Sequence, residues 1–254
     1  MSQPFRDLPV FSRDPWQMSY GERAALEGIL SSLRPRLSIE IGRAEGGSLR
    51  RIAAHSEAVI SLDLIEAPAE IGELANVTLR VGDSRRLLPE ELSRLATAGE
   101  NVDFVLVDGD HSAAGARTDV LALLESPAAR HTLILAHDSL NEDVRTGLMS
   151  VPFAEYEKVA WVDLDFLPGG VAKQGSLRGH CWGGLALIVV DETGAFDAGG
   201  LFNETYFPMS DALWSWGRAQ RDPPATTGDP PATTGDPPAT TGEQLRRRRW
   251  RKRG

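Results

Sequence analysis

The feature that most constrains the fold of this chain is a regular alternation of short apolar runs with segments of helical periodicity. Five apolar runs, each followed by Gly, Asp or His, are typical of buried strands and occupy residues 37–41, 58–62, 77–81, 102–107 and 132–136. Helix-compatible segments lie between them, over residues 49–55, 89–98 and 112–125. Because parallel strands need crossover connections, this order predicts an α/β fold with a doubly wound, mostly parallel sheet and helices on both faces.

Two further segments extend this pattern at its ends. Ser19 and Glu22 have the spacing of a capping box before a run of helical periodicity, so we expect a helix to open the domain. Two β-rich runs, over residues 158–166 and 184–191, are joined by a Gly-rich loop and predict an antiparallel hairpin. Added to the five parallel strands, this hairpin gives a seven-stranded sheet with a C-terminal antiparallel strand.

The C-terminal end has a different composition. Three copies of Asp-Pro-Pro-Ala-Thr-Thr-Gly fill positions 222–242, and such a repeat cannot bury an apolar face. We therefore expect an N-terminal segment over residues 1–18, a folded domain over residues 19–218 and a disordered tail over residues 219–254. The tail ends in a basic block at residues 246–253, which could bind an anionic partner or stay solvated. The formal net charge of −9 argues against nonspecific nucleic-acid binding by the domain.

The composition also excludes several classes of protein. The longest apolar runs, such as residues 185–190, are too short to cross a bilayer, so no membrane span is expected. The first residues lack a basic segment followed by an apolar stretch, so we expect no secretory signal and a cytoplasmic location. Cys181 is the only cysteine, which excludes an internal disulfide and a multi-cysteine metal site.

Polar residues follow each of the five predicted strands. They are Glu40 to Ser48 around the end of the first strand, Asp63 after the second, Asp83 and Ser84 after the third, Asp108 to His111 after the fourth, and His137 and Asp138 after the fifth. In an open α/β sheet, ligands bind beyond the carboxyl ends of the strands. The sequence therefore predicts a single ligand site at this edge of the sheet.

The loop after the first strand carries the most informative motif. Gly42, Ala44 and Gly47 nearly match the dinucleotide-binding fingerprint, but Ala44 replaces the glycine that lets the backbone approach a pyrophosphate. Glu40 and Glu45 add negative charge, which would repel a pyrophosphate but suits a ligand that carries an ammonium and a sulfonium. S-adenosylmethionine carries both groups. A tight turn without a ligand is the simpler structural alternative for these glycines.

In another register, this loop resembles the first motif of class I S-adenosylmethionine-dependent methyltransferases. The residues that carry the resemblance are Glu40, Gly42, Gly46 and Ser48. The resemblance implies a Rossmann-like fold, a loop that cradles the methionine part of the cofactor, and Asp63 bound to the ribose hydroxyls. Asp83, with Ser84 beside it, is similar to the family residue near the adenine amino group. Helix capping or turn formation is the structural alternative for Asp63 and Asp83.

The residues after the fourth and fifth predicted strands form a more specific motif than Asp83 and Ser84. Residues 108–111 read DGDH and residues 137–138 read HD, and together they closely resemble a branch of small-molecule methyltransferases. A hydroxyl acceptor must lose its proton during methyl transfer. His111 and His137 are the available bases, either directly or through a divalent ion. A hydrogen-bonded structural role is the alternative for each member of this set.

Asp108 is implied in cofactor binding by the resemblance and also belongs to a candidate metal site. Some related methyltransferases bind magnesium through an aspartate at the fourth strand and two polar residues at the fifth, positions that correspond to Asp108, His137 and Asp138. A histidine in this set is less natural for magnesium and easier for manganese, iron or zinc. The resemblance therefore implies S-adenosylmethionine as the cofactor and leaves open a divalent cation, magnesium or manganese.

The function implied by the resemblance is transfer of a methyl group to a small-molecule acceptor, with a hydroxyl favoured. A nicotinamide-dependent oxidoreductase is the enzymatic alternative, which Ala44 and the acidic loop disfavour. A non-catalytic cofactor-binding or scaffold protein is an alternative from another class. The acceptor pocket should be built from the N-terminal segment, the loop after His137 and the loop over residues 167–183, in which Trp182 is the aromatic residue to test. A homo-oligomer is left open.

Overall fold

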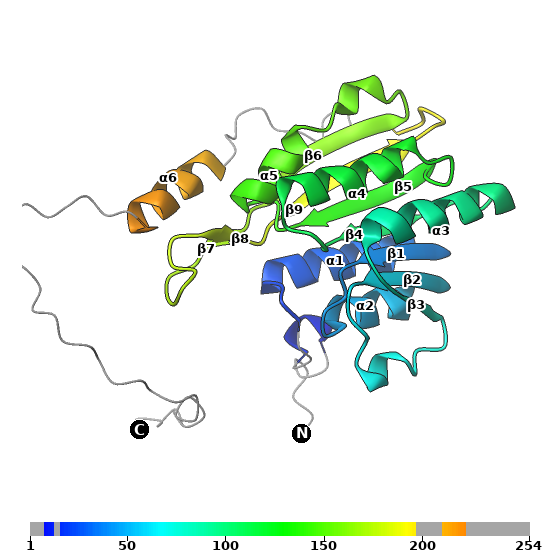
Figure 1. Ribbon diagram of the computed structural model, residues 1–254, viewed down its shortest axis with the longest axis horizontal. Coiled ribbons are helices and arrows are strands. Elements are labelled where there is room, and N and C mark those ends of the chain that lie inside the picture. Colours follow the sequence, from blue (N-terminus) through cyan, green and yellow to red (C-terminus); the bar gives the residue numbers. More distant parts are fainter. Residues whose placement is uncertain (1–7, 13–15, 197–209, 222–254) are drawn as a thin grey trace, which may run out of the picture. The chain divides into compact units, whose positions relative to one another are not determined.

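The computed structural model describes residues 8–12, 16–196 and 210–221. Its main sheet has seven strands in the order β3-β2-β1-β4-β5-β9-β6 (Figure 1). The strands are β1 (Leu37–Ile41), β2 (Ala58–Asp63), β3 (Val77–Val81), β4 (Phe104–Val107), β5 (His131–His137), β6 (Val159–Leu167) and β9 (Leu185–Asp191). The first five are parallel, and β9 runs antiparallel to both β5 and β6. The predicted doubly wound α/β sheet and its antiparallel ending are confirmed.

Helices cover both faces of this sheet. The α-helices of the described residues are α1 (Tyr20–Leu33), α2 (Gly47–His55), α3 (Ser84–Ala98), α4 (Ala113–Glu125), α5 (Glu142–Met149) and α6 (Ser210–Arg221). Short 3-10 turns occur at Pro9–Phe11, Ala69–Ile71 and Phe153–Glu155. Buried side chains of α3, α4 and α5 join one core cluster, on the face nearer the viewer in Figure 1. Those of α1 and α2 join a second cluster, with side chains from the other face of the sheet.

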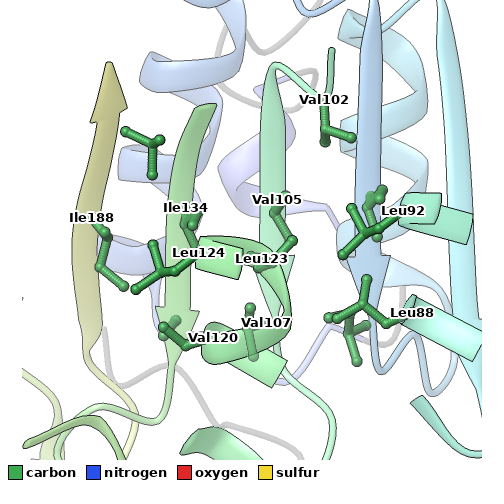
Figure 2. Packing of buried hydrophobic residues seen from close by; sticks show 14 of the residues in the cluster. Leu88, Leu92, Val102, Val105, Val107, Val120, Leu123, Leu124, Ile134 and Ile188 are labelled. Carbon is green, nitrogen blue, oxygen red and sulfur yellow. The ribbon is translucent and has the colours of Figure 1, made fainter. Parts of the chain in front are cut away.

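The central strands are buried on both faces because helices cover both. Val105 and Val107 of β4 lie in the same cluster as Val120 and Leu123 of α4 (Figure 2). Phe104, on the alternate face of β4, belongs to the cluster beneath α1 and α2. Burial of such a side chain stabilises the fold by about 1.5–3 kcal/mol. A shift of one residue would exchange the two faces, so this burial fixes the register that brings the strand ends to one edge.

The start of α3 differs from its sequence prediction. The helix begins at Ser84, whereas the sequence pattern predicts it only from Pro89. The reason is a cap: the carboxylate of Asp83 accepts a hydrogen bond from the backbone N–H of Arg85 and satisfies one of the free amides of the first turn. Pro89 consequently lies inside the helix instead of at its first position.

Three elements are not predicted by the sequence pattern. Helix α5 is only eight residues long and follows Asn141, whose side chain caps it. A second, two-stranded sheet pairs β7 (Gly170–Val171) with β8 (Cys181–Trp182) inside the Gly-rich loop. Helix α6 continues to Arg221, past the predicted domain end at residue 218. The predicted tail lies outside the described residues from residue 222 onward.

Candidate active site

A cavity of about 540 Å³ lies at the carboxyl ends of the parallel strands. Its lining includes most residues predicted for the site, namely Gly42, Ser48, Asp63, Asp83, Ser84, Asp108, His111, His137 and Asp138. Glu40 and Gly46 are not part of this lining. Trp16, Gln17 and Met18 contribute to it from the N-terminal segment, which is one of the regions expected to form the acceptor pocket. The strand-end residues therefore surround one cavity.

The glycine loop, residues 42–47, has a backbone that two of its glycines make possible. Gly42 has a φ of +84°, and a Cβ there would lie 2.0 Å from the carbonyl oxygen of Asp108. Gly46, the N-cap of α2, has a φ of +79°, and its Cβ would lie 2.4 Å from Ile71 Cδ1. Both positions therefore exclude larger residues on steric grounds as well as by conformation.

Asp63, at the end of β2, is bonded to the glycine loop. Its Oδ2 accepts hydrogen bonds from the backbone N–H groups of Arg43 at 2.8 Å and Ala44 at 3.0 Å. Its Oδ1 accepts a further bond from the N–H of Ile65 at 3.0 Å. Two backbone donors of the loop are therefore engaged by a carboxylate and are not free to bind a pyrophosphate. This arrangement counts against the dinucleotide alternative.

Glu40 lies behind the loop and is fully buried. Ser48 Oγ donates to its Oε1 at 2.6 Å, and Ser61 Oγ donates to its Oε2 at 3.1 Å. Burial raises the pKa of Glu40 to about 8, in spite of these two hydrogen bonds. The carboxyl group is thus largely protonated at neutral pH and ties the first turn of α2 to β1 and β2. This connection favours a supporting role over direct contact with a ligand.

Asp83 and Ser84 lie at the start of α3 and line the same cavity as the glycine loop. Besides capping the helix, Asp83 forms an ion pair with Arg85 at 2.7 Å. Hydrogen bonds from Arg85 lower the pKa of the Asp83 carboxyl group, which is exposed. The structural alternative, a helix cap, is therefore realised at Asp83. Its place in the lining still leaves the carboxylate accessible to a ligand.

The second half of the site is a compact group of two histidines and two aspartates, which we call the His–Asp cluster: Asp108, His111, His137 and Asp138. His137 Nδ1 lies 2.9 Å from Asp108 Oδ1 and 3.6 Å from Asp138 Oδ2. His111 Nε2 faces the same two carboxylates, at 3.5 Å from Asp108 Oδ1 and 3.1 Å from Asp138 Oδ2. Each imidazole therefore lies between two carboxylate oxygens.

These carboxylates determine the protonation of both histidines. Hydrogen bonds to Asp108 and Asp138 raise the pKa of His111 to about 10. Burial opposes the charged form of His137, but the charge of Asp108 and the neighbouring carboxylates outweigh it and raise the pKa of His137 well above its ordinary value. Both imidazoles are therefore protonated at neutral pH while both carboxylates face them. In this state neither histidine can accept a proton.

Asp138 is held in place by its backbone and by the loop before β9. Its φ is +54°, a left-handed conformation that is uncommon for a residue other than glycine. Its Oδ1 accepts a hydrogen bond from the N–H of Gly183, which leaves Oδ2 directed at the two histidines. Strained residues of this kind are often found at functional sites.

Glu22, from the capping box of α1, also reaches the cluster. It is 2% exposed, and one of its oxygens accepts a hydrogen bond from the N–H of Ser19. The other oxygen accepts from the N–H of Gly184 and lies 3.5 Å from His137 Nε2. Burial would raise the pKa of Glu22, but its interactions with His137 outweigh this effect and lower it to about 2. The capping box is the only sequence signal at this position, and it indicates a helix start.

The donor set of the cluster suits a divalent cation. Asp108, His137 and Asp138 each offer one ligand atom, and these three atoms lie within 4.8 Å of one another. Two are carboxylate oxygens and one is an imidazole nitrogen, all of them usual metal ligands. His137 Nε2 is buried without a hydrogen-bond partner among the described residues, and Glu22 stands beside it. A metal-bound histidine commonly has its second ring nitrogen next to a carboxylate.

Trp182 adds an aromatic side chain to this half of the site. Its ring meets the ring of His111 edge to face, with centroids 5.6 Å apart. It belongs to β8 and directly precedes Gly183, the residue that donates to Asp138. The loop that contains β7 and β8 therefore reaches the cluster, as expected for the region 167–183.

Comparisons with known proteins agree with this fold. Residues 39–139 match a family model described as a methyltransferase domain. No curated protein matches the sequence significantly. Among solved structures, the chain is similar to the MycE methyltransferase from the mycinamycin biosynthetic pathway, in complex with Mg, SAH and mycinamycin VI. The identity is 18% and the TM-score 0.51, and the match covers 75% of this chain and 54% of that chain.

Two other solved structures are similar with lower TM-scores. Cofactor-bound Rv0187 from MTB is 20% identical, with a TM-score of 0.49 and coverage of 69% of this chain and 82% of that chain. The O-methyltransferase TomG from Streptomyces achromogenes, in complex with SAM, is 18% identical, with a TM-score of 0.47 and coverage of 68% and 81%. At these identities the likeness concerns the fold alone.

The match over residues 39–139, less than half of the chain, and the sheet order both agree with a methyltransferase domain of class I. The methyltransferase activity and the cofactor S-adenosylmethionine predicted from the motifs are confirmed at this level. The narrower resemblance of the DGDH and HD motifs to one branch stays a prediction. Among the described residues, no helix is long and apolar enough to span a membrane.

Proposed function

We propose that this enzyme transfers the methyl group of S-adenosylmethionine to a hydroxyl group of a small molecule. The observation that carries the proposal is the position of the His–Asp cluster in the lining of the same cavity as the glycine loop. A neutral amine can attack a methyl donor with its own lone pair, whereas a hydroxyl group must also lose a proton. A cluster of imidazoles and carboxylates is suited to that second task.

The cofactor would lie along the glycine loop. Gly46 has no side chain to cap α2, so the first amides of this helix suit the carboxylate of the methionine part. Asp63 Oδ1 accepts one bond from the protein and has room for a ribose hydroxyl. Asp83, on the rim near the start of α3, would accept a bond from the adenine amino group. Each role is assigned by position and chemistry.

The His–Asp cluster would hold the acceptor and take its proton. A divalent cation bound by Asp108, His137 and Asp138 would lower the pKa of a hydroxyl group beside it. His111 is the more accessible imidazole, with a side chain 41% exposed, against 5% for His137. The hydrogen bonds to Asp108 and Asp138 are what raises the pKa of His111. If these carboxylates bind a cation instead, the pKa of His111 falls and its imidazole can act as a base. In-line positioning of the acceptor supplies much of the remaining rate.

A turnover assay tests the proposal. Purified enzyme is mixed with labelled S-adenosylmethionine and with matched pairs of small acceptors that differ only in carrying a hydroxyl or an amine, with and without Mn²⁺ or Mg²⁺. We expect transfer of label to hydroxyl acceptors and formation of S-adenosylhomocysteine in equal amount. Exclusive methylation of amines would contradict the proposal. Cofactor binding without turnover on any acceptor would favour the scaffold alternative.

Other expectations from the sequence stay predictions. An anionic partner for the basic block at residues 246–253 concerns a segment outside the described residues. The homo-oligomer and the cytoplasmic location are likewise left to experiment. Sedimentation of the purified chain would test the oligomer, and sedimentation with an anionic polymer such as heparin, with and without residues 222–254, would test the anionic partner.

A further inference from the structure

We propose that the His–Asp cluster selects a transition-metal dication over Mg²⁺, and that Glu22 is a positioning residue that fixes His137 as the nitrogen ligand. This inference deepens the proposed function, since it concerns the same site, but metal binding can be measured without methyl transfer. It rests on the direction of both ring nitrogens of His137 and on the burial of its surroundings.

The first step concerns the ligand atoms. His137 Nδ1 lies 2.9 Å from Asp108 Oδ1 and 3.6 Å from Asp138 Oδ2. Ligands that each lie about 2.1 Å from one ion are separated from their neighbours by about 3 to 3.5 Å. The nitrogen therefore already has nearly the separation of a neighbouring ligand from each oxygen, and all three residues offer ligand atoms within 4.8 Å of one another. An ion among them would replace the one proton that His137 Nδ1 donates to Asp108 Oδ1.

The second step concerns the other ring nitrogen. His137 Nε2 is buried and has no hydrogen-bond partner among the described residues. Glu22 Oε1, at 3.5 Å, is the carboxylate oxygen that faces it. A bound ion at Nδ1 leaves the ring proton on Nε2, and a small movement of the ring would give that proton a charged acceptor. Such outer carboxylates fix the tautomer and the orientation of metal-binding histidines.

Glu22 itself has little freedom to move. The N–H of Ser19 holds one of its oxygens and the N–H of Gly184 holds the other. These donors come from the start of α1 and from the loop before β9, so two distant segments fix the carboxylate beside His137. A capping box alone would not require the contact with Gly184. The position of Glu22 is therefore set for the cluster as well as for the helix.

The third step concerns the choice of metal. Mg²⁺ prefers oxygen ligands and loses its water reluctantly, whereas imidazole suits zinc, iron, nickel and similar transition-metal ions better. His111 Nε2, at 3.1 Å from Asp138 Oδ2, brings a second imidazole to the same oxygens. The cluster thus surrounds one small volume with nitrogen as well as oxygen. This composition favours a transition-metal ion.

The test is calorimetric titration of the full-length protein with Co²⁺, Mn²⁺ and Mg²⁺, together with the visible spectrum of the Co²⁺ form. We expect Co²⁺ to bind at least ten times more tightly than Mg²⁺. Because Co²⁺ binds most sites more tightly than Mg²⁺, the decisive quantity is the change of this ratio in His137→Asp. We expect this variant, with oxygen ligands only, to reduce the ratio at least ten-fold and to alter the Co²⁺ spectrum.

Glu22→Gln tests the positioning role, because glutamine keeps the capping box. We expect about ten-fold weaker Co²⁺ binding, as for other outer-shell changes, with little change for Mg²⁺. His131→Asn, at the far end of β5, is the matched control and should change neither. Equal affinities for Co²⁺ and Mg²⁺, or an unchanged ratio in His137→Asp that still binds S-adenosylmethionine, would overturn the proposal. Normal metal selectivity without methylation would instead refute only the proposed function.

Discussion

The two halves of the site are built differently. The cofactor half, formed by the glycine loop with Glu40 and Asp63, is held by contacts between consecutive elements, such as the bond from Ser48 to Glu40. The His–Asp cluster instead joins the ends of β4 and β5 to α1 and to the loop before β9, as in the bond between Gly184 and Glu22. One half is therefore local in sequence, and the other depends on tertiary assembly.

This difference predicts different responses to mutation. Changes in the glycine loop should act on its backbone and hence on cofactor affinity and stability together. Changes of the two histidines of the His–Asp cluster should act on the reaction and leave the cofactor affinity nearly intact, because these side chains are not needed to shape the loop. The halves are linked at the end of β1, where the N–H of Asp108 donates to the carbonyl oxygen of Ile41 and Gly42 packs against the carbonyl oxygen of Asp108.

The largest effect is expected for Gly42→Ala, because the new methyl group would meet the Asp108 carbonyl oxygen in a backbone conformation that disfavours alanine. We expect at least a 100-fold loss of S-adenosylmethionine affinity with a lowered melting temperature, measured by calorimetry and thermal denaturation. Gly28→Ala, in an exposed turn of α1 with open space around it, is the control and should be neutral or stabilising. Normal affinity in Gly42→Ala would refute the close packing of the two halves.

The second prediction concerns His137→Ala. We expect turnover to fall about 100-fold or more, because the variant removes a cluster ligand and a proton-handling group, while S-adenosylmethionine affinity changes less than about three-fold. His131→Ala, in the same strand but paired with Asp191 at the other end, should turn over normally. Initial-rate kinetics and calorimetry separate the two quantities. A large loss of cofactor affinity would show that the halves are not independent.

The third prediction concerns Asp63→Ala, which removes the acceptor of two loop amides and the proposed ribose ligand. We expect about a 10- to 100-fold loss of S-adenosylmethionine affinity, consistent with the loss of hydrogen bonds to a charged group, and little change in the KM for the acceptor. The exposed Glu66→Ala serves as control. Unchanged cofactor affinity would remove Asp63 from the cofactor half.

The fourth prediction concerns the pH dependence of stability at Glu40, which is not an effect on cofactor binding or turnover. The pKa of this carboxyl group is raised from 4.5 to about 8 by burial, so between these pH values the folded state binds a proton that the unfolded state has lost. The free energy of unfolding should therefore decrease as pH rises through this window, by about 2–4 kcal/mol from this group. Urea denaturation of wild type and Glu40→Gln between pH 5 and 8.5 measures it. Identical slopes for the two proteins would contradict the assignment.

The sequence predicts the cofactor half better than the His–Asp cluster for a physical reason. The strands at residues 37–41 and 77–81 coincide with β1 and β3 because a buried parallel strand has a short, distinctive apolar run. The glycines of the loop are likewise visible, because their backbone conformation admits few other residues. The parallel topology then brings the polar residues after each strand to one edge.

The remaining features depend on contacts that a single sequence does not encode locally. In the sequence, Glu22 indicates only the start of a helix. Its hydrogen bond with Gly184 could not be predicted, because the two residues are 162 positions apart. The protonation of His111 and His137 could not be predicted, because it follows from carboxylates that only the fold places beside them. Helix α5 is too short to show a periodic pattern.

Calorimetric titration with S-adenosylmethionine, S-adenosylhomocysteine and NADH tests the central claim most directly. In the structure, Asp63 already accepts hydrogen bonds from the two loop amides that a dinucleotide would need. We therefore predict that S-adenosylmethionine and S-adenosylhomocysteine bind at one site per chain and compete with each other, while NADH gives no signal. Binding of NADH with no binding of the other two would contradict the account of the cofactor half and of the function built on it.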